Sequence, residues 1–408
     1  MSYDLPIRRA DTLFNDAWLP EETKQIRKQV REFADDVVRP VAHKLNTTPE
    51  SRDAFPHQEM KAIADAGIYK IPYIKAVGGL GLEFPTLATL TVLEELGYYS
   101  PGLASALYDG QAILVGKTLE RAKPELRDQY LPSLIRGEWI GSFATSEPEA
   151  STDLSVETMQ TIATKVEGGW KINGRKRWIT NSCVADYILV LCRTGDGLSM
   201  LFAKLKAPGV KVFDPDLKMG NHAQLTSDIE FTDAFVPEDH IVGEVNGGLS
   251  IALAALAVGR MGIGAIGVAM AQAAFDFSTT YMCKRKIFGK ELASMQHWQY
   301  QFADHAVGIE QARTMYQKAG WLQDIHGKSV VEGAMAKLTG SRLAVDVARD
   351  AIQVCGGYGF AREMLGSGEV WPLESIYRDA KIGEIYEGAN EIQKWVIARN
   401  IFGRNFTG

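Results

Sequence analysis

The stretch Thr164–Asn181, TKVEGGWKINGRKRWITN, separates two kinds of sequence. Within it apolar and polar residues alternate, and the pairs Gly168-Gly169 and Asn173-Gly174 are typical of hairpin turns. A third turn signal lies at 195–197. Short runs with strand character surround these turns: Ile162–Val166, Trp170–Ile172, Trp178–Thr180, Tyr187–Cys192, Leu198–Leu205 and Ile229–Phe231. We therefore predict a compact antiparallel β domain over residues 139–247.

Before this region, apolar residues recur at helical spacing. One run begins at Pro20, has acidic residues in its first turn, and is expected to end at Pro40. Similar apolar stripes occupy residues 56–68, 86–97 and 123–136. We predict an N-terminal helical domain over residues 1–138.

After the β region the chain becomes helical again. Long periodic segments cover residues 249–285, 295–325, 329–355 and 389–402. They predict a C-terminal four-helix bundle over residues 248–408. The order of the three regions predicts an α+β fold for the whole chain. The most apolar part, around Ile251–Ala274, is interrupted by Gly259 and Arg260, which favours a buried core helix over a membrane span.

Composition excludes several classes of function. The 44 basic and 50 acidic side chains give a net charge of −6 without a long basic stripe, so we expect no nucleic-acid partner. The four cysteines are scattered and predict free, mostly buried thiols, and the seven histidines include no pair at metal-ligand spacing. The N-terminus lacks a secretory signal pattern, so we expect a cytoplasmic protein, or a mitochondrial-matrix protein if a transit peptide has been removed.

Five motifs, taken together and in order, resemble the acyl-CoA dehydrogenase flavoprotein family. They are SEPEASTD at Ser146–Asp153, RWITN at Arg177–Asn181, KRKIFGK at Lys284–Lys290, QVCGGYGF at Gln353–Phe360 and RDAKIGEIYEGANEIQ at Arg378–Gln393. The resemblance spans nearly the whole chain in the same α–β–α order. It implies α,β-dehydrogenation of an acyl thioester, with FAD as the hydride acceptor.

Glu387 matches the catalytic glutamate of the family. The resemblance implies that it removes the α-proton, with Tyr386 helping to desolvate it and Gly388 allowing the backbone to approach the thioester. From the residue pattern alone, an acid favoured by the dipole of the following helix is equally open. One subfamily takes its base from the position that is Gly259 here, and glycine cannot serve. Arg260 would lie near the thioester, or would be a buried, ion-paired arginine.

The resemblance also implies a set of FAD contacts in the β domain. Phe143, Thr145, Ser146 and Thr152 belong to the flavin-binding loop, although the same stretch also suits an ordinary Ser/Asp-rich connector. Three strand residues would line the flavin: Trp178, Ile179 and Thr180. Alternation puts Trp178 and Thr180 on one face and Ile179 on the other, and the Thr180 hydroxyl would donate toward flavin N5.

A second set of residues would reach the FAD of a neighbouring subunit. Its members are Arg285, Phe288, Gln296, Gln353, Gly356 and Gly357. Arg285 suits a pyrophosphate, and the two glycines allow close approach to phosphates, although a helix C-cap would explain them as well. This cross-subunit site implies at least a dimer, and the family pattern implies a homotetramer.

The combined hypothesis is an FAD-dependent acyl-CoA dehydrogenase that acts on a short or medium neutral acyl-CoA and passes electrons to an electron-transferring flavoprotein. A neutral acyl group is expected because residues 97–116 contain no arginine that would bind a second carboxylate. Three alternatives stay open: an oxidase, a dehydrogenase acting on a carrier-protein thioester, and a non-catalytic flavoprotein or assembly partner. Many members of the family have an aspartate that contacts CoA at the position of Ala257. Its absence here leaves open whether the acyl group is carried by CoA or by a carrier protein.

Overall fold

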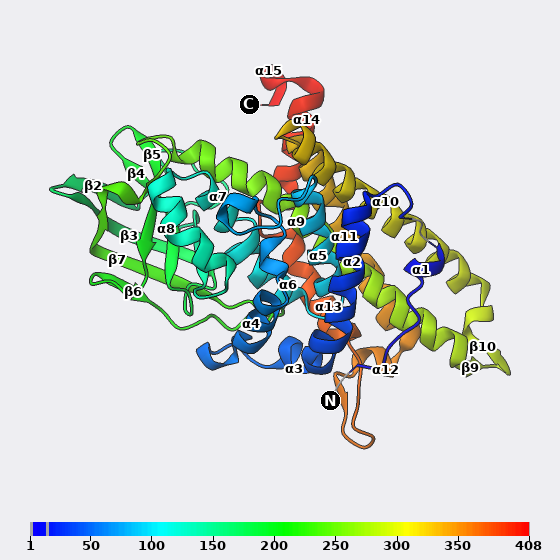
Figure 1. The fold of residues 1–408 in the computed structure, drawn as a ribbon. Helices are drawn as coiled ribbons and strands as arrows, with labels where there is room; N and C mark the ends of the chain where they lie inside the picture. Colours follow the sequence, from blue (N-terminus) through cyan, green and yellow to red (C-terminus); the bar gives the residue numbers. More distant parts are fainter. Residues whose placement is uncertain (1–2, 14–15, 408) are drawn as a thin grey trace.

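The computed structural model describes residues 3–13 and 16–407 (Figure 1). Helices precede and follow one β-sheet, as the sequence predicts. The α+β class is therefore confirmed, whereas the exact domain limits stay predictions. The helices before the sheet are α1 (Ala10–Leu13), α2 (Glu21–Phe33), α3 (Ala42–Thr47), α4 (His57–Asp65), α5 (Pro85–Gly97), α6 (Pro101–Leu107), α7 (Gly116–Glu120) and α8 (Pro124–Ile135).

Pro40 does not end the first long helix, contrary to the prediction. The chain passes from α2 through a π-helical turn, Ala34–Val38, and a 3-10 turn, Arg39–Val41, directly into α3. Proline is tolerated because it lies in the first turn of a new helical segment, where its missing N–H needs no partner.

The sheet is mixed rather than wholly antiparallel. Its main path runs β6-β7-β3-β2-β4-β5-β8, while β1 pairs with β4 in parallel. The strands are β1 (Gly141–Ala144), β2 (Ile162–Val166), β3 (Gly169–Thr180), β4 (Tyr187–Thr194), β5 (Gly197–Lys204), β6 (Val210–Val212), β7 (Thr226–Pro237) and β8 (Ile241–Val242). The parallel strand carries the chain from the N-terminal helices into the sheet, beside the loop that follows Ala144.

The three turn signals have different outcomes. Residues 168–169 and 195–197 join antiparallel neighbours, β2 to β3 and β4 to β5, as predicted. Asn173-Gly174 is not a turn: β3 runs straight through it, with an irregularity opposite β7. A Cβ atom at Gly174 would lie 2.6 Å from the Thr161 Cα atom, so glycine here permits close packing instead of a reversal.

The C-terminal region is built around α9 (Gly248–Lys284). It contacts α10 (Gln296–His326) and, most extensively, α11 (Val330–Cys355), and α14 (Asn390–Phe402) packs on α11. The smaller elements are β9 (Lys286–Ile287), β10 (Lys290–Glu291), α12 (Gly357–Phe360), β11 (Glu363–Met364), β12 (Glu369–Val370), α13 (Leu373–Ala380) and α15 (Arg404–Thr407). The most apolar window of α9 is 72% buried within the protein, as the core-helix interpretation predicts.

Close packing of α9 on α11 decides the geometry of the site. A Cβ atom at Gly267 would lie 2.5 Å from the Gly340 carbonyl oxygen, so the two backbones touch without intervening side chains. This contact brings residues of the first half of α11 next to the middle of α9. All four cysteines are free, and only Cys283 is exposed, which agrees with the prediction.

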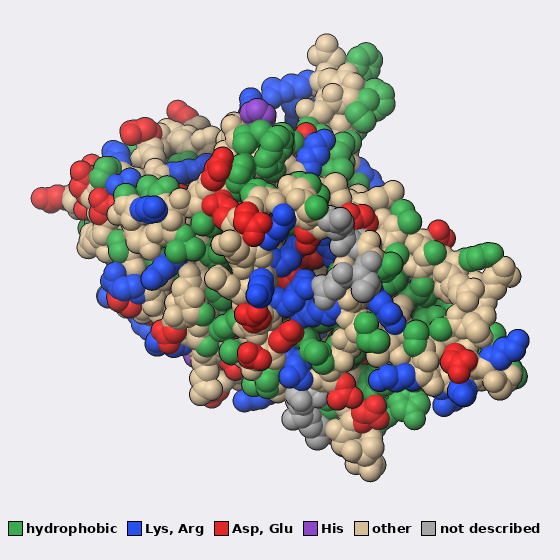
Figure 2. Space-filling model, turned by 45° about the vertical axis from the view of Figure 1, so that its right-hand side comes forward, with side chains coloured by type: hydrophobic (Ala, Val, Ile, Leu, Met, Phe, Trp, Pro, Cys, Tyr) green, Lys and Arg blue, Asp and Glu red, His purple; other side chains and the backbone are tan. Residues whose placement is uncertain are grey.

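A buried charge network fixes the N-terminal helices to α10. Glu94 of α5 accepts hydrogen bonds from Arg27 of α2, at 3.0 Å, and from Arg313 of α10, at 2.8 Å. Arg31 of α2 binds both carboxylate oxygens of Glu95, each at 3.0 Å. Figure 2 shows these basic and acidic side chains gathered in a hollow at the centre of one face. The network makes the arrangement of α2, α5 and α10 specific.

Candidate active site

Glu387 lies in a tight reversal, not in a helix. Its φ angle is +57°, and that of Gly388 is +81°, so two successive residues are left-handed. For a residue with a Cβ atom this conformation costs about 1–2 kcal/mol. Helix α14 begins at Asn390, and the acid in its first turn is Glu391. The helix-dipole interpretation of Glu387 is therefore wrong.

The Glu387 carboxylate occupies space that Gly259 leaves empty. A Cβ atom at position 259 of α9 would lie 2.6 Å from Glu387 Oε2. Oε2 is buried and has no hydrogen-bond partner among the described residues, and the same holds for the nearby Tyr108 Oη. Burial raises the pKa of Glu387, while hydrogen bonding by Tyr108 and the charges of Arg260 and Lys337 lower it. Tyr108 is therefore close to Glu387, although no hydrogen bond of normal geometry joins them.

Lys337 is a part of the site that sequence reasoning missed. It is fully buried on α11, and its Nζ atom donates to Asn390 Oδ1 at 2.8 Å, at the start of α14. Burial lowers the pKa of Lys337 to about 8, against the opposing charge of Glu387. The sequence contains a signal for a buried lysine here. Ala334 and Ser341, three residues before and four residues after Lys337, share its helix face and are small and buried, so a solvated lysine is not expected on that face.

Arg260 belongs to α9, where it follows Gly259, and it is 9% exposed. Its Nε atom has no hydrogen-bond partner, and no carboxylate of the described residues lies within salt-bridge distance of its guanidinium group. Burial lowers the pKa of Arg260, and the charge of Glu387 counteracts this. The alternative of an ion-paired structural arginine finds no partner in the described chain, which leaves its donors free for a ligand.

A buried ion pair holds the predicted flavin loop in place. The side chains of Lys176 and Glu147 are both almost fully buried, and Lys176 Nζ lies 2.8 Å from Glu147 Oε1. Lys176 Nζ also donates to the Thr145 carbonyl oxygen at 3.1 Å. Glu147 in turn accepts the backbone N–H groups of Gln160 and Thr161. This pair holds the loop after β1 in a defined shape.

The predicted loop residues differ in exposure. Phe143 is buried in the main core, so its side chain does not face solvent. Thr145 and Ser146 are half-buried, and Thr152 is exposed. Among these four, the two half-buried hydroxyl residues are the best placed to contact a bound group with both side chain and backbone.

The end of β3 presents its residues alternately, as predicted. Trp178 is 54% exposed and has a φ angle of +60°, whereas Ile179 is 2% exposed in the core of the sheet. Ile179 can therefore offer only its backbone to a flavin. The Thr180 hydroxyl accepts a hydrogen bond from Gln224 Nε2 at 2.9 Å, which orients it.

The residues predicted to serve a neighbouring subunit lie far from Glu387. Arg285 follows the last residue of α9, about 39 Å along the helix axis from Gly259 at 1.5 Å per residue. All six members of this set are exposed, and Phe288 is 95% exposed. Within one chain, Arg285 therefore does not reach Glu387.

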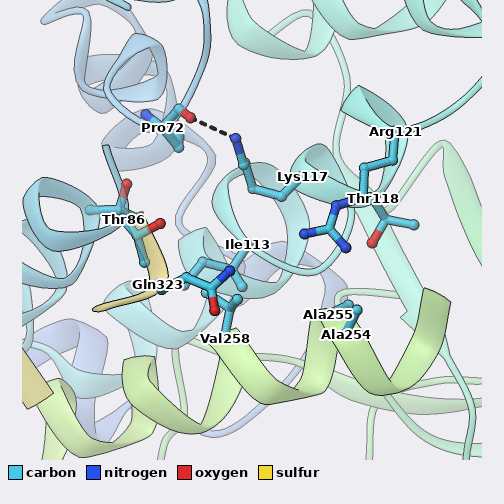
Figure 3. Close-up of a pocket in the computed structure, with 11 residues that line it drawn as sticks. Pro72, Thr86, Ile113, Lys117, Thr118, Arg121, Ala254, Ala255, Val258 and Gln323 are labelled. Carbon is cyan, nitrogen blue, oxygen red and sulfur yellow. Dashed lines mark hydrogen bonds between the residues drawn. The ribbon is translucent and has the colours of Figure 1, made fainter. Parts of the chain in front are cut away.

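A separate cleft is lined by residues next in sequence to Leu114 and Gly259 (Figure 3). Ile113 and Val258 line it, while the side chain of Leu114 would contact a Cβ atom at Gly259 on the Glu387 side. Lys117 enters this cleft, but its Nζ atom donates to the Pro72 carbonyl oxygen at 3.0 Å and pairs with Glu120. Its charge is therefore already balanced.

Comparison with known proteins identifies the chain. Models of the acyl-CoA dehydrogenase N-terminal, middle and C-terminal domains match residues 20–138, 142–234 and 246–402. The chain belongs to the acyl-CoA dehydrogenase family. It is 33% identical over 389 residues to the short-chain specific acyl-CoA dehydrogenase of Clostridium acetobutylicum, covering 94% of this chain and 99% of that one.

Solved structures agree with this assignment. Butyryl-CoA dehydrogenase from Megasphaera elsdenii superposes with a TM-score of 0.87 at 29% identity, over 95% of this chain and 99% of that one. A structure described in work on the electron transferring flavoprotein of Acidaminococcus fermentans gives the same values. The protein is thus an acyl-CoA dehydrogenase, an oxidoreductase of a family of FAD-containing flavoproteins.

Proposed function

We propose that Glu387 is the base that removes the α-proton of an acyl-CoA thioester in this acyl-CoA dehydrogenase. The observation that carries the proposal is the carboxylate of the half-buried Glu387, whose Oε2 atom is buried, has no hydrogen-bond partner among the described residues and fills the space beside Gly259. A structural carboxylate at such a depth would normally be fully hydrogen-bonded.

The surroundings of Glu387 suit proton abstraction. An α-proton is weakly acidic, so the base needs a pKa nearer to neutral than that of an ordinary carboxylate, and burial shifts Glu387 in this direction. The charges of Arg260 and Lys337 act against the shift and favour the ionised form of the carboxylate. The backbone N–H of Glu387 donates to none of the described residues, so it is free to bind the thioester oxygen.

The residues near the end of β3 and the loop after β1 fit FAD. The exposed indole of Trp178, the oriented hydroxyl of Thr180, and the anchored segment at Thr145 and Ser146 provide a flat apolar contact and hydrogen-bonding groups. When bound, FAD supplies the acceptor for the hydride that leaves the β-carbon. The α-proton passes to Glu387, and the electron pair of its C–H bond forms the new double bond.

The exposed set at the end of α9 is proposed to hold the FAD of a neighbouring copy. Arg285 would contact the pyrophosphate, and Phe288 would pack on the adenosine portion once the subunits assemble. The exposure of Phe288 in a single chain supports burial by a second copy. A homotetramer follows as the proposed assembly.

The proposed substrate is a short or medium acyl-CoA without a second carboxylate. The names of the relatives, short-chain specific and butyryl-CoA dehydrogenase, support the chain length. Residues 97–116 contain no arginine that would bind a second carboxylate, whereas the neighbouring cleft is lined by Arg121 and by Lys117, which is paired with Glu120. An electron-transferring flavoprotein is the proposed electron acceptor, supported by the context of the Acidaminococcus fermentans structure.

Anaerobic titration of the purified, yellow protein with butyryl-CoA tests the function. We expect bleaching of the flavin band, and turnover with a dye or a flavoprotein acceptor that far exceeds turnover with oxygen alone. Comparable turnover with oxygen would identify an oxidase. A protein that binds flavin but is bleached by none of the straight-chain acyl-CoAs from four to eight carbons would contradict the proposal.

A further inference from the structure

Asp109 is a buried carboxyl group that the fold does not explain. It lies in the π-helical turn Tyr108–Ala112 that continues α6, and it is 2% exposed. Its Oδ1 atom has no hydrogen-bond partner among the described residues. A buried ionisable group without a partner costs several kcal/mol, so such residues are retained mainly where a ligand completes them. Single π-helical turns are also frequent at functional sites.

The turn that carries Asp109 lies between the two halves of the proposed active site. On one side it contacts the end of β3: Asn181 Nδ2 donates to the Ala106 carbonyl oxygen at 2.9 Å, and a Cβ atom at Gly110 would lie 3.0 Å from Asn181 Nδ2. On the other side its neighbour Leu114 would contact a Cβ atom at Gly259, beside Glu387. Asp109 is therefore held between β3 and α9.

The electrostatics of Asp109 agree with this position. Burial and the charge of Glu387 raise the pKa of Asp109 well above the ordinary value, and a hydrogen bond from the side chain of Thr180 acts in the opposite direction. Only the Oδ1 atom of Asp109 is therefore left for a ligand. Arg260 and Lys337 stabilise the charge of Glu387 but are not among the groups that affect Asp109. No basic side chain of the described chain balances it.

We propose that Asp109 is a specificity residue that binds a hydrogen-bond donor on the acyl chain, so that the preferred substrate is an acyl-CoA carrying a hydroxyl or amino group rather than a plain alkyl chain. This inference rests on the proposed function, since it takes the acyl chain to pass between Glu387 and Thr180. A plain alkyl chain would leave Asp109 Oδ1 buried without a partner, and such mismatches strongly reduce binding.

The test compares pairs of CoA thioesters with the purified flavoenzyme under anaerobic conditions. Pentanoyl-CoA is paired with 5-hydroxypentanoyl-CoA, and hexanoyl-CoA with 6-aminohexanoyl-CoA, and the rate of flavin reduction per unit concentration is measured for each. We expect at least one polar member to be favoured by about 10-fold or more over its alkyl partner. The pair in which the polar member is favoured shows whether the preferred donor is a hydroxyl or an ammonium group.

Two variants at position 109 separate specificity from folding. Asp109→Leu should reverse the preference, favouring the alkyl thioester by about 10-fold, because the unpaired carboxyl group is gone. Asp109→Asn, which is isosteric, should keep a hydroxyl preference and lose an ammonium preference. Asp276→Asn serves as the matched control, because Asp276 is a fully buried aspartate whose carboxylate is already bound by Tyr98 and Gln272.

The outcomes distinguish this proposal from the function on which it rests. A wild-type enzyme that is reduced equally well by both members of each pair, or better by the alkyl members, would overturn the role of Asp109 while leaving the role of Glu387 intact. An unchanged ratio in Asp109→Leu would do the same. If neither member of either pair reduces the flavin, the proposed function itself fails, and this inference fails with it.

Discussion

Glu387 Oε2 lies where a side chain at Gly259 would begin: the distance from the oxygen to a Cβ atom at position 259 would be 2.6 Å. A side chain at position 259 would therefore require the Glu387 carboxylate to move. A glycine at 259 is more than the absence of a rival base, since it creates the space that the carboxylate of Glu387 occupies.

Replacing Gly259 by alanine should displace the Glu387 carboxylate. Because the added methyl group would overlap Oε2, we expect turnover to fall about 100-fold or more while flavin content is kept. Steady-state kinetics with butyryl-CoA measures the effect. Gly308→Ala in α10 is the control, since its methyl group would meet only the flexible end of Leu343. Equal activity of the two variants would show that the carboxylate is not confined as described.

Removing the charge of Lys337 should shift the pH dependence of flavin reduction. Lys337 lowers the pKa of Glu387, so Lys337→Met raises that pKa, and the rise in rate with increasing pH should move to higher pH by about 0.5–1 unit. Stopped-flow reduction between pH 5 and 9 measures the shift. The exposed Lys318→Met variant should leave the profile in place. A profile for Lys337→Met that coincides with wild type would remove Lys337 from the electrostatics of the site.

The buried pair Lys176–Glu147 should stabilise the flavin loop only as a pair. Lys176→Met leaves Glu147 buried without its partner, and we expect a loss of about 3 kcal/mol of stability together with weaker flavin retention. The double variant Lys176→Met, Glu147→Gln should lose less than the single variant. Thermal unfolding and flavin release report both effects, and a double variant worse than the single one would contradict this account.

Glu50 should make stability depend on acid pH. Although burial alone would raise the pKa of Glu50, hydrogen bonding by His222 and Lys218 lowers it to about 2. A lowered folded-state pKa gives stability that is present above the unfolded-state value of 4.5 and is lost as the pH falls toward 2. Glu50→Gln should therefore cost about 1–3 kcal/mol at pH 7 and almost nothing near pH 2.

Thermal unfolding of wild type and Glu50→Gln across this pH range measures the difference. The control is Asp65→Asn, which removes an exposed partner of Lys61 and should change stability by less than about 0.5 kcal/mol. A cost for Glu50→Gln that stays constant from pH 7 to pH 2 would contradict the assignment.

Much of the helical architecture was predictable because long apolar stripes determine it. The segments expected at 249–285 and 329–355 correspond to α9 and α11 within a few residues. Local signals failed where tertiary contacts overrode them. Asn173-Gly174 has the composition of a turn, but pairing with β7 keeps it extended. Pro40 lies in the first turn of a 3-10 segment, where its missing N–H needs no partner, so the helical path continues.

The candidate site was predictable only in part. The family motif located Glu387, but no local pattern revealed that Gly259 provides its space, because that contact joins residues 128 positions apart. Asp109 was missed for the same reason, because it resembles an ordinary turn residue until the π-helical turn is packed. Lys337 was missed although small residues at helical spacing around it gave a local signal.

The central claim, that Glu387 removes the α-proton, is tested most directly by hydrogen exchange at the α-carbon. Butyryl-CoA is incubated anaerobically with enzyme in D₂O, and deuterium at the α-carbon is followed by NMR. We expect exchange with wild type and at least about a 1000-fold loss of exchange with Glu387→Gln, which should still bind flavin and butyryl-CoA. Exchange by Glu387→Gln at the wild-type rate would show that another group is the base.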